Sequence, residues 1–314
     1  MIAAIILITI AFFWFLIETS YLKVRLSYDF PTVSEPCKKI PKPHKEAKAE
    51  SLYHPEYPKA ATYRIDYSAL TIPLLYLIAI VSAELVVALV NPLGGIIFHI
   101  VLIFVLVFHA SAPTKNSRHR LYLTIALAPL IRVLSLSLPL INFPPIYWYA
   151  ITAIPLLIAT FMLMRSLNFR FKQVGFTLNR MPLQLLVGLS GILFGIIEFY
   201  ILRPTPLVSS LTWQGLVLPV IILMVGTGFV EEFIFRGVMQ SVAVEAIGRW
   251  GWIYVAVLFA VLHVGYLSVA DVGFVLVVGF FFGWVVQKTG SLLGVTLSHG
   301  ITNILLYLIV PFFI

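Results

Sequence analysis

The sequence predicts an all-α membrane protein, a polytopic bundle of about nine to ten membrane-spanning helices. Its 314 residues are 61% hydrophobic and only 11% charged, whereas a soluble domain carries about 25% charged residues. The apolar residues gather in long runs, and several of these have the roughly 20 residues that a helix needs to cross a bilayer. The net charge of +8 does not indicate a nucleic-acid partner, because the basic residues lie mostly in loops between the runs.

The apolar runs begin at the start of the chain. Residues 2–22 have no basic leading segment and no clear cleavage site, so we expect a first span at 1–22 rather than a signal peptide. The segment 23–66 is polar and rich in lysine and proline, which favours a poorly ordered cytoplasmic loop over a folded domain. The later runs are 68–90, 93–112, 121–141, 146–164, 182–202, 213–240, 251–267, 271–287 and 291–313.

The character of the runs changes near residue 182. Residues 67–181 contain mostly plain lipophilic runs and are expected to form accessory membrane spans. Residues 182–314 place glycine and polar residues inside the runs, so we expect the functional core there. Glycines such as Gly228 and Gly300 are expected to let helices approach closely.

Basic residues in the short loops predict the orientation of the chain. Lysine and arginine gather at 113–120 and 165–181, while the alternate turns carry almost none. The positive-inside rule places these two loops and the segment 23–66 in the cytoplasm. The run 213–240 then crosses from outside to inside, in a multi-pass protein of the cell membrane.

One run carries a cluster of charges. Glu231, Glu232 and Arg236 lie within six positions of very apolar sequence. An ionisable residue at bilayer depth costs about 3 kcal/mol or more, so it indicates function by default. Glu232 and Arg236 are four residues apart, in the favourable order for an ion pair on one helix face. Glu231 points about 100° away, and we expect it to face a wet cavity.

Two later runs add polar residues at similar depth. His263 and His299 lie on separate predicted helices, and Asn303 follows His299 by one helical turn. Counted from the predicted cytoplasmic ends, Glu231 and the two histidines lie roughly 12–18 Å deep. We therefore expect one polar cavity, opening toward the cytoplasmic side.

These residues carry a resemblance to a known family. The three motifs resemble those of the CAAX prenyl protease and bacteriocin-processing family, also called the ABI or type II CAAX endopeptidase family of intramembrane glutamate peptidases. The resemblance covers roughly residues 180–310. The motifs, in chain order, are Glu231-Glu232-x-x-x-Arg236, Phe259-x-x-x-His263 and His299-x-x-x-Asn303.

The resemblance implies a role for each catalytic candidate. Glu231, helped by His263, would hold and deprotonate a water molecule that attacks the scissile carbonyl. His299 and Asn303 would donate hydrogen bonds to the tetrahedral oxyanion. These roles agree with general chemistry, because a carboxylate with a histidine can activate water and each oxyanion donor contributes about 3–4 kcal/mol.

The predicted function is therefore an intramembrane endopeptidase that cleaves near the tail of a lipid-modified or membrane-associated protein. A prenylated substrate is implied by the resemblance alone. We expect no metal or other cofactor, although Glu231, His263 and His299 could also supply three ligands to Zn²⁺.

Two further functions stay open. One is a non-proteolytic immunity or scaffold protein of the same family. The other is a proton-coupled transporter. A transporter should often have interrupted helices in both halves of the chain, whereas the polar motifs within the runs are confined to the second half here, which disfavours this function. Glu84, Arg132 and Glu198 match no motif and are assigned structural roles, with Glu84 and Arg132 expected to pair between helices.

Overall fold

The computed structural model describes residues 67–112, 118–138 and 143–314. The predicted first span, 1–22, and the predicted loop, 23–66, lie outside these residues. The described chain is helical and contains no strand, so the prediction of an all-α polytopic bundle is confirmed.

Eight helices in the described residues are long and apolar enough to cross a membrane. A ninth apolar segment, Trp250–Tyr266, is shorter. The spans before it are α2 (Tyr67–Leu89), α3 (Pro92–Ser111), α4 with α5 (Arg118–Ile125, Leu127–Ser137), α6 (Pro145–Ser166), α7 (Met181–Leu202) and the helix Trp213–Ile247. The short segment itself is α11 (Trp250–Val261) with η5 (Val264–Tyr266). The two spans after it are α12 (Val269–Thr289) and α13 (Leu293–Ile304), which continues through η6 (Leu305–Ile309) and η7 (Val310–Phe312).

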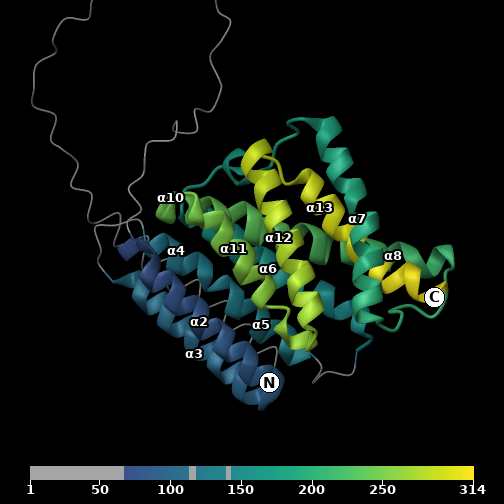
Figure 1. The fold of residues 1–314 in the computed structure, drawn as a ribbon, viewed down its shortest axis with the longest axis horizontal. Helices are drawn as coiled ribbons and strands as arrows, with labels where there is room; N and C mark the ends of the chain where they lie inside the picture. Colours follow the sequence, from purple (N-terminus) through teal and green to yellow (C-terminus); the bar gives the residue numbers. More distant parts are fainter. Residues whose placement is uncertain (1–66, 113–117, 139–142) are drawn as a thin grey trace, which may run out of the picture.

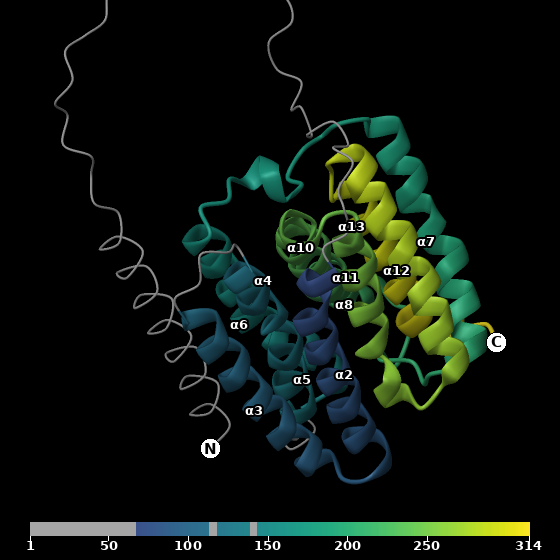
Figure 2. The same ribbon diagram turned by 60° about the vertical axis from the view of Figure 1, so that its left-hand side comes forward.

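The helices form two groups around a shared interior. In Figures 1 and 2, α2, α3 and α5 lie together on one side, while α7, α12 and α13 lie together on the other. The helix α11 lies between the groups and packs against α12. The outer surface of α7 is apolar, because the leucines at 185, 186, 189 and 193 are each more than half exposed. This surface suits contact with lipid chains.

The longest helix, Trp213–Ile247, has 35 residues and carries the charge cluster. It extends beyond residue 240, where the sequence predicted its end. It is composed of α8 (Trp213–Leu223), the π-helical turn η3 (Met224–Phe229), α9 (Val230–Glu232), the π-helical turn η4 (Phe233–Met239) and α10 (Gln240–Ile247). Such π-helical turns occur frequently at functional sites, and here two of them flank Glu231 and Glu232.

A contact between two glycines brings this helix against α13. A Cβ atom on Gly228 would lie 2.8 Å from the Cα atom of Gly300, so neither position has room for a side chain. The expectation that these glycines allow close approach is confirmed. Because the backbones nearly touch, Glu231 and Glu232 lie within reach of side chains on α13.

Candidate active site

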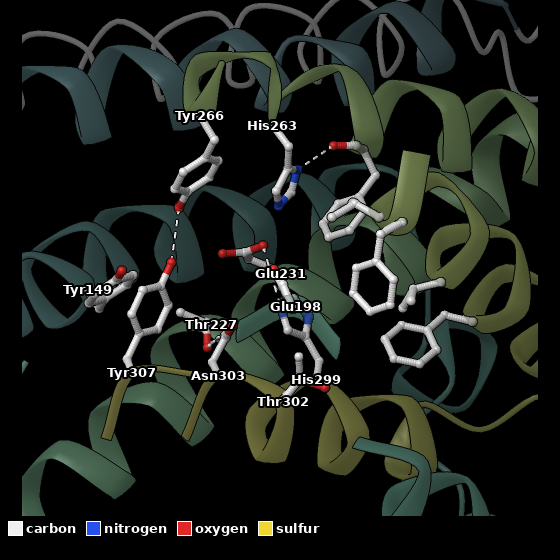
Figure 3. Close-up of a pocket in the computed structure, with 15 residues that line it drawn as sticks. Tyr149, Glu198, Thr227, Glu231, His263, Tyr266, His299, Thr302, Asn303 and Tyr307 are labelled. Atoms are coloured by element: carbon white, nitrogen blue, oxygen red, sulfur yellow. Dashed lines mark hydrogen bonds and ion pairs between the residues drawn. The ribbon is translucent and has the colours of Figure 1, made fainter. Parts of the chain in front are cut away.

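A cavity of about 80 Å³ opens where α7, α11, α12, α13 and the helix Trp213–Ile247 meet. Glu231, His263, His299 and Asn303 all line it, although they come from three separate helices (Figure 3). The predicted convergence of these four side chains on one cavity is therefore observed. The other lining residues are Tyr149, Glu198, Thr227, Phe259, Tyr266, Phe274, Val275, Val278, Phe282, Thr302 and Tyr307.

Glu232 lies behind the cavity and joins two elements of the site. Its Oε1 atom accepts a hydrogen bond from Nη1 of Arg236 at 3.0 Å, which is the ion pair that the spacing predicted. The same oxygen accepts a second hydrogen bond from Nδ1 of His299 at 2.8 Å. The sequence did not predict this second contact, because it joins helices 67 residues apart. Glu232 thus holds both its own helix and the histidine of α13.

Arg236 is almost completely buried, at 1% exposure, and is enclosed by aromatic rings. Its guanidinium carbon lies 4.2 Å from the ring centre of Phe259 and 5.6 Å from that of Phe282. A cation facing an aromatic ring is attracted to the negative ring face, and the attraction grows when water is excluded. Phe259, the first residue of the second motif, therefore covers the cation that balances Glu232.

The backbone at the end of α11 orients His263. The N–H of His263 bonds to the carbonyl of Ala260 at 3.0 Å, which leaves the Phe259 carbonyl without its usual helical donor. The Nδ1 atom of His263 bonds to that carbonyl at 3.0 Å. A carbonyl oxygen can only accept, so Nδ1 carries the proton. In the neutral ring Nε2 is then an acceptor, and the ring lines the cavity.

Asn303 is oriented by a chain of hydrogen bonds. Its Nδ2 atom donates to Oγ1 of Thr227 at 2.8 Å. The Thr227 hydroxyl donates in turn to the carbonyl of Leu223 at 2.6 Å, so its oxygen can accept from the amide. This arrangement fixes the amide plane and leaves the second N–H of Asn303 available at the cavity wall.

Glu231 is the more accessible of the two adjacent carboxylates. Its side chain is 27% exposed, whereas that of Glu232 is fully buried. Its Oε2 atom lies 3.9 Å from Nε2 of His299, too far for a direct hydrogen bond. The division predicted from helix geometry, with Glu232 in the ion pair and Glu231 facing the cavity, agrees with these positions.

Several residues that line the cavity could not be predicted from the sequence. Tyr149, Tyr266 and Tyr307 line it, as does Thr227, and no spacing marked any of them. Glu198 also lines it, although it was assigned a structural role. An acidic residue inside an apolar run is a signal for function, and Glu198 carries this signal although it belongs to none of the three motifs.

The depth estimate for the site also changes. Ending the span at residue 240 placed Glu231 about nine residues from the cytoplasmic end of its helix. The helix continues to Ile247, so Glu231 lies near the middle of its 35 residues. Tyr266, which is 51% exposed at the rim, lies at the end of the segment Trp250–Tyr266 opposite Arg249.

A catalytic zinc site needs about three protein ligands around one ion. Among the described residues, no three His, Cys, Asp or Glu side chains are grouped so that they could hold a metal ion. The zinc alternative, which needs Glu231, His263 and His299 around one ion, therefore finds no support in these positions.

Comparisons with known proteins bear on the second half of the chain. No curated protein and no solved structure matches the sequence. Residues 213–305 match the family model described as type II CAAX prenyl endopeptidase Rce1-like. The matched segment contains all three motifs and every residue of the proposed catalytic group. The resemblance inferred from the motifs is thereby confirmed for residues 213–305, which are similar to the Rce1-like type II CAAX prenyl endopeptidases.

Proposed function

We propose that this protein is an intramembrane endopeptidase that hydrolyses a peptide bond near the tail of a membrane-associated protein. One observation carries the proposal, namely that Glu231 and His263 line the same cavity as His299 and Asn303. The match of residues 213–305 to a family of membrane endopeptidases supports a peptidase over the transporter alternative.

Glu231 and His263 are suited to activate a water molecule. A water bound between them donates one hydrogen to the Glu231 carboxylate and the other to Nε2 of His263. Its lone pair then points to the open part of the cavity, where the scissile carbonyl would lie. Glu231 takes the proton as the water attacks, and it returns that proton to the leaving amine. General acid–base assistance of this kind contributes about 10²- to 10⁴-fold in rate.

His299 and Asn303 are suited to stabilise the oxyanion. Nδ1 of His299 is held by Glu232, so in the imidazolium form its Nε2–H points to the cavity. The free N–H of Asn303 lies one helical turn further along α13. Two fixed donors aimed at the developing charge favour the tetrahedral intermediate over the planar amide. We assign Glu232 and Arg236 the task of holding this group in place.

The substrate is proposed to enter from the membrane. The cavity lies among apolar helices, and the wall formed by Phe274, Val275, Val278 and Phe282 suits an aliphatic or lipid-modified residue. Prenylation of the substrate is suggested by the family match and not by any residue of this wall.

The positions of Arg249 and Tyr266 bear on which side of the membrane the cavity opens to. The positive-inside rule puts the loop at Arg249 in the cytoplasm of the cell, and the rim residue Tyr266 lies at the other end of that segment. We therefore propose that the rim faces away from the cytoplasm, in place of the cytoplasmic opening expected from sequence. A membrane-impermeant maleimide should label Tyr266→Cys, in a Cys37→Ser background, in intact cells. Labelling in inverted vesicles alone would restore the cytoplasmic opening.

The catalytic proposal is tested with purified protein and a fluorogenic peptide in detergent or proteoliposomes. Glu231→Gln and His263→Ala should each abolish cleavage while the melting temperature stays near that of the wild type. Glu245→Gln is the matched control, because the exposed Glu245 forms an ion pair with Arg120 and does not line the cavity. Cleavage should also survive a strong chelator. Full activity in either cavity variant refutes the mechanism, and loss of activity with the chelator favours the zinc alternative.

A further inference from the structure

Glu198 is a buried acid that the proposed mechanism does not use. It lies on α7, lines the catalytic cavity and is only 8% exposed (Figure 3). Within the described residues it has neither a hydrogen-bond partner nor an ion-pair partner. Two other buried glutamates differ in this respect, because Glu84 contacts Arg132 and His99 while Glu232 contacts Arg236 and His299. Glu198 is thus the acid of the cavity wall that no hydrogen-bonded or ion-paired cation balances within the described residues.

Burying a carboxylate without a partner is unfavourable. A polar group removed from water must regain its hydrogen bonds, and a buried charge must find an opposite charge. Helices in a membrane retain such residues mainly where they serve function. Because Glu198 lines the space that a substrate would fill, a group of the substrate would supply the missing partner.

The surroundings of Glu198 favour a cation as that partner. Three tyrosines line the same cavity, with Tyr149 and Tyr307 at a ring-centre distance of 6.2 Å. The hydroxyl oxygens of Tyr266 and Tyr307 lie 3.3 Å apart. Aromatic faces attract cations, and hydroxyl oxygens accept hydrogen bonds from an ammonium group with three donors. Asp271, in the first turn of α12, adds a second buried carboxylate whose oxygens have no partner within the described chain.

We propose that Glu198 and the tyrosines form a subsite that binds a cationic side chain of the substrate, a lysine or an arginine close to the scissile bond. The apolar wall on α12 would hold a neighbouring aliphatic residue, so the preferred substrate pairs one basic residue with one apolar residue. This inference rests on the proposed peptidase function and adds a preference that the shared motifs do not contain.

The test compares two fluorogenic peptides that differ at one position, where one has lysine and the other has norleucine. Norleucine keeps the aliphatic stem and lacks the amine. The position is scanned over the three residues on either side of the cleavage site. At one position the wild type should cleave the lysine peptide with a kcat/KM about 10- to 100-fold higher, the range for a hydrogen bond to a charged group. Glu198→Gln should reduce that ratio to below about 2-fold, mainly by lowering kcat/KM for the lysine peptide, while Glu245→Gln should retain the wild-type ratio.

Three outcomes overturn the subsite. The first is an equal loss for both peptides in Glu198→Gln, which indicates a general role in the chemistry. The second is an unchanged lysine preference in that variant. The third is the absence of any lysine preference in the wild type.

A binding measurement separates this inference from the peptidase proposal. Fluorescence anisotropy is recorded for both peptides with Glu231→Gln and with the double variant Glu231→Gln/Glu198→Gln. Tighter binding of the lysine peptide to the first variant alone supports the subsite even where no peptide is cleaved. Equal binding of both peptides to both variants refutes it.

Discussion

Replacing Glu232 with glutamine should separate the structural work of the charge cluster from its catalytic work. Oε1 of Glu232 accepts two hydrogen bonds, one from Arg236 at 3.0 Å and one from His299 at 2.8 Å. Glutamine keeps the shape and the accepting oxygen, and it removes the negative charge. The buried guanidinium of Arg236 and the ring of His299 would both lose their anionic partner.

The expected effect on stability follows from the burial of the pair. Both side chains of the ion pair are fully buried, and breaking such a pair from one side destabilises a protein by about 3–5 kcal/mol. We expect the lower end of this range, because the amide oxygen still accepts both hydrogen bonds. The expected effect on catalysis follows from His299, because its proposed imidazolium form loses the anion that favours it, and with it the Nε2–H donor. Loss of one oxyanion donor lowers kcat by about 10²- to 10³-fold.

The double variant Glu232→Gln/Arg236→Met distinguishes the two effects. Methionine has an unbranched side chain that packs well against aromatic rings, and Phe259 and Phe282 already enclose the site of the guanidinium. Replacing a buried pair with apolar groups is often neutral for stability, so the melting temperature should return close to that of the wild type. The activity should stay low, because His299 still lacks its carboxylate.

Thermal unfolding in detergent and kcat/KM on one fluorogenic peptide measure both effects in the same preparation. Recovery of activity together with stability in the double variant would show that His299 does not depend on the charge of Glu232. A single variant as stable and as active as the wild type would refute the whole assignment of this residue.

Four further substitutions are expected to act at defined points. Thr227→Val removes the acceptor of Asn303, so kcat should fall about 10-fold with little change in KM, and Asn303→Ala should lower kcat about 10²-fold. Steady-state kinetics on peptides of different affinity check this, because each variant should lower kcat by the same factor for every peptide. Gly228→Ala places a Cβ atom against Gly300 and should lower the free energy of unfolding by about 1–3 kcal/mol, measured by thermal unfolding. Glu84→Ala leaves the partly buried Arg132 without its anion and should cost about 3 kcal/mol, the low end of the range for a buried pair, whereas an unchanged melting temperature would show the pair to be dispensable.

Much of the site could be predicted because helix geometry is regular. A spacing of four residues predicted the pair of Glu232 and Arg236, and the angle of about 100° between neighbouring residues separated Glu231 from it. The number of spans in the described chain followed from the length of the apolar runs. The glycine contact between Gly228 and Gly300 followed from the tendency of small residues to lie where membrane helices touch.

Other features could not be predicted because they depend on contacts between distant segments. The bond from His299 to Glu232 and the bond from Asn303 to Thr227 each join different helices. The proton position on His263 depends on a carbonyl freed by the irregular end of α11. The π-helical turns around Glu231 have no spacing signature, and the helix continued past residue 240 because its later residues are also compatible with a helix.

The accessory helices contribute to the site through a side chain that lies outside the matched segment. Arg132, held by Glu84 at 2.6 Å, has a guanidinium nitrogen 2.9 Å from the position that a Cβ atom on Gly265 would occupy. Gly265 is in the turn between His263 and Tyr266, so the ion pair of α2 and α5 supports the turn that carries two cavity residues. The residues before 182 are therefore more than lipid-facing cover for the core.

The charges of the cavity explain why a cationic substrate needs Glu198. Glu232 is balanced by Arg236, and in the proposed mechanism Glu231 is balanced by the imidazolium of His299. The catalytic group is then neutral as a whole, which lets it remain at membrane depth, where an unbalanced charge is costly. A cation that entered this neutral group would compete with Arg236 or His299 for a carboxylate and would disturb the activated water. Glu198 offers a carboxylate outside both pairs, so a basic substrate residue can bind there while Glu231 stays available for the water.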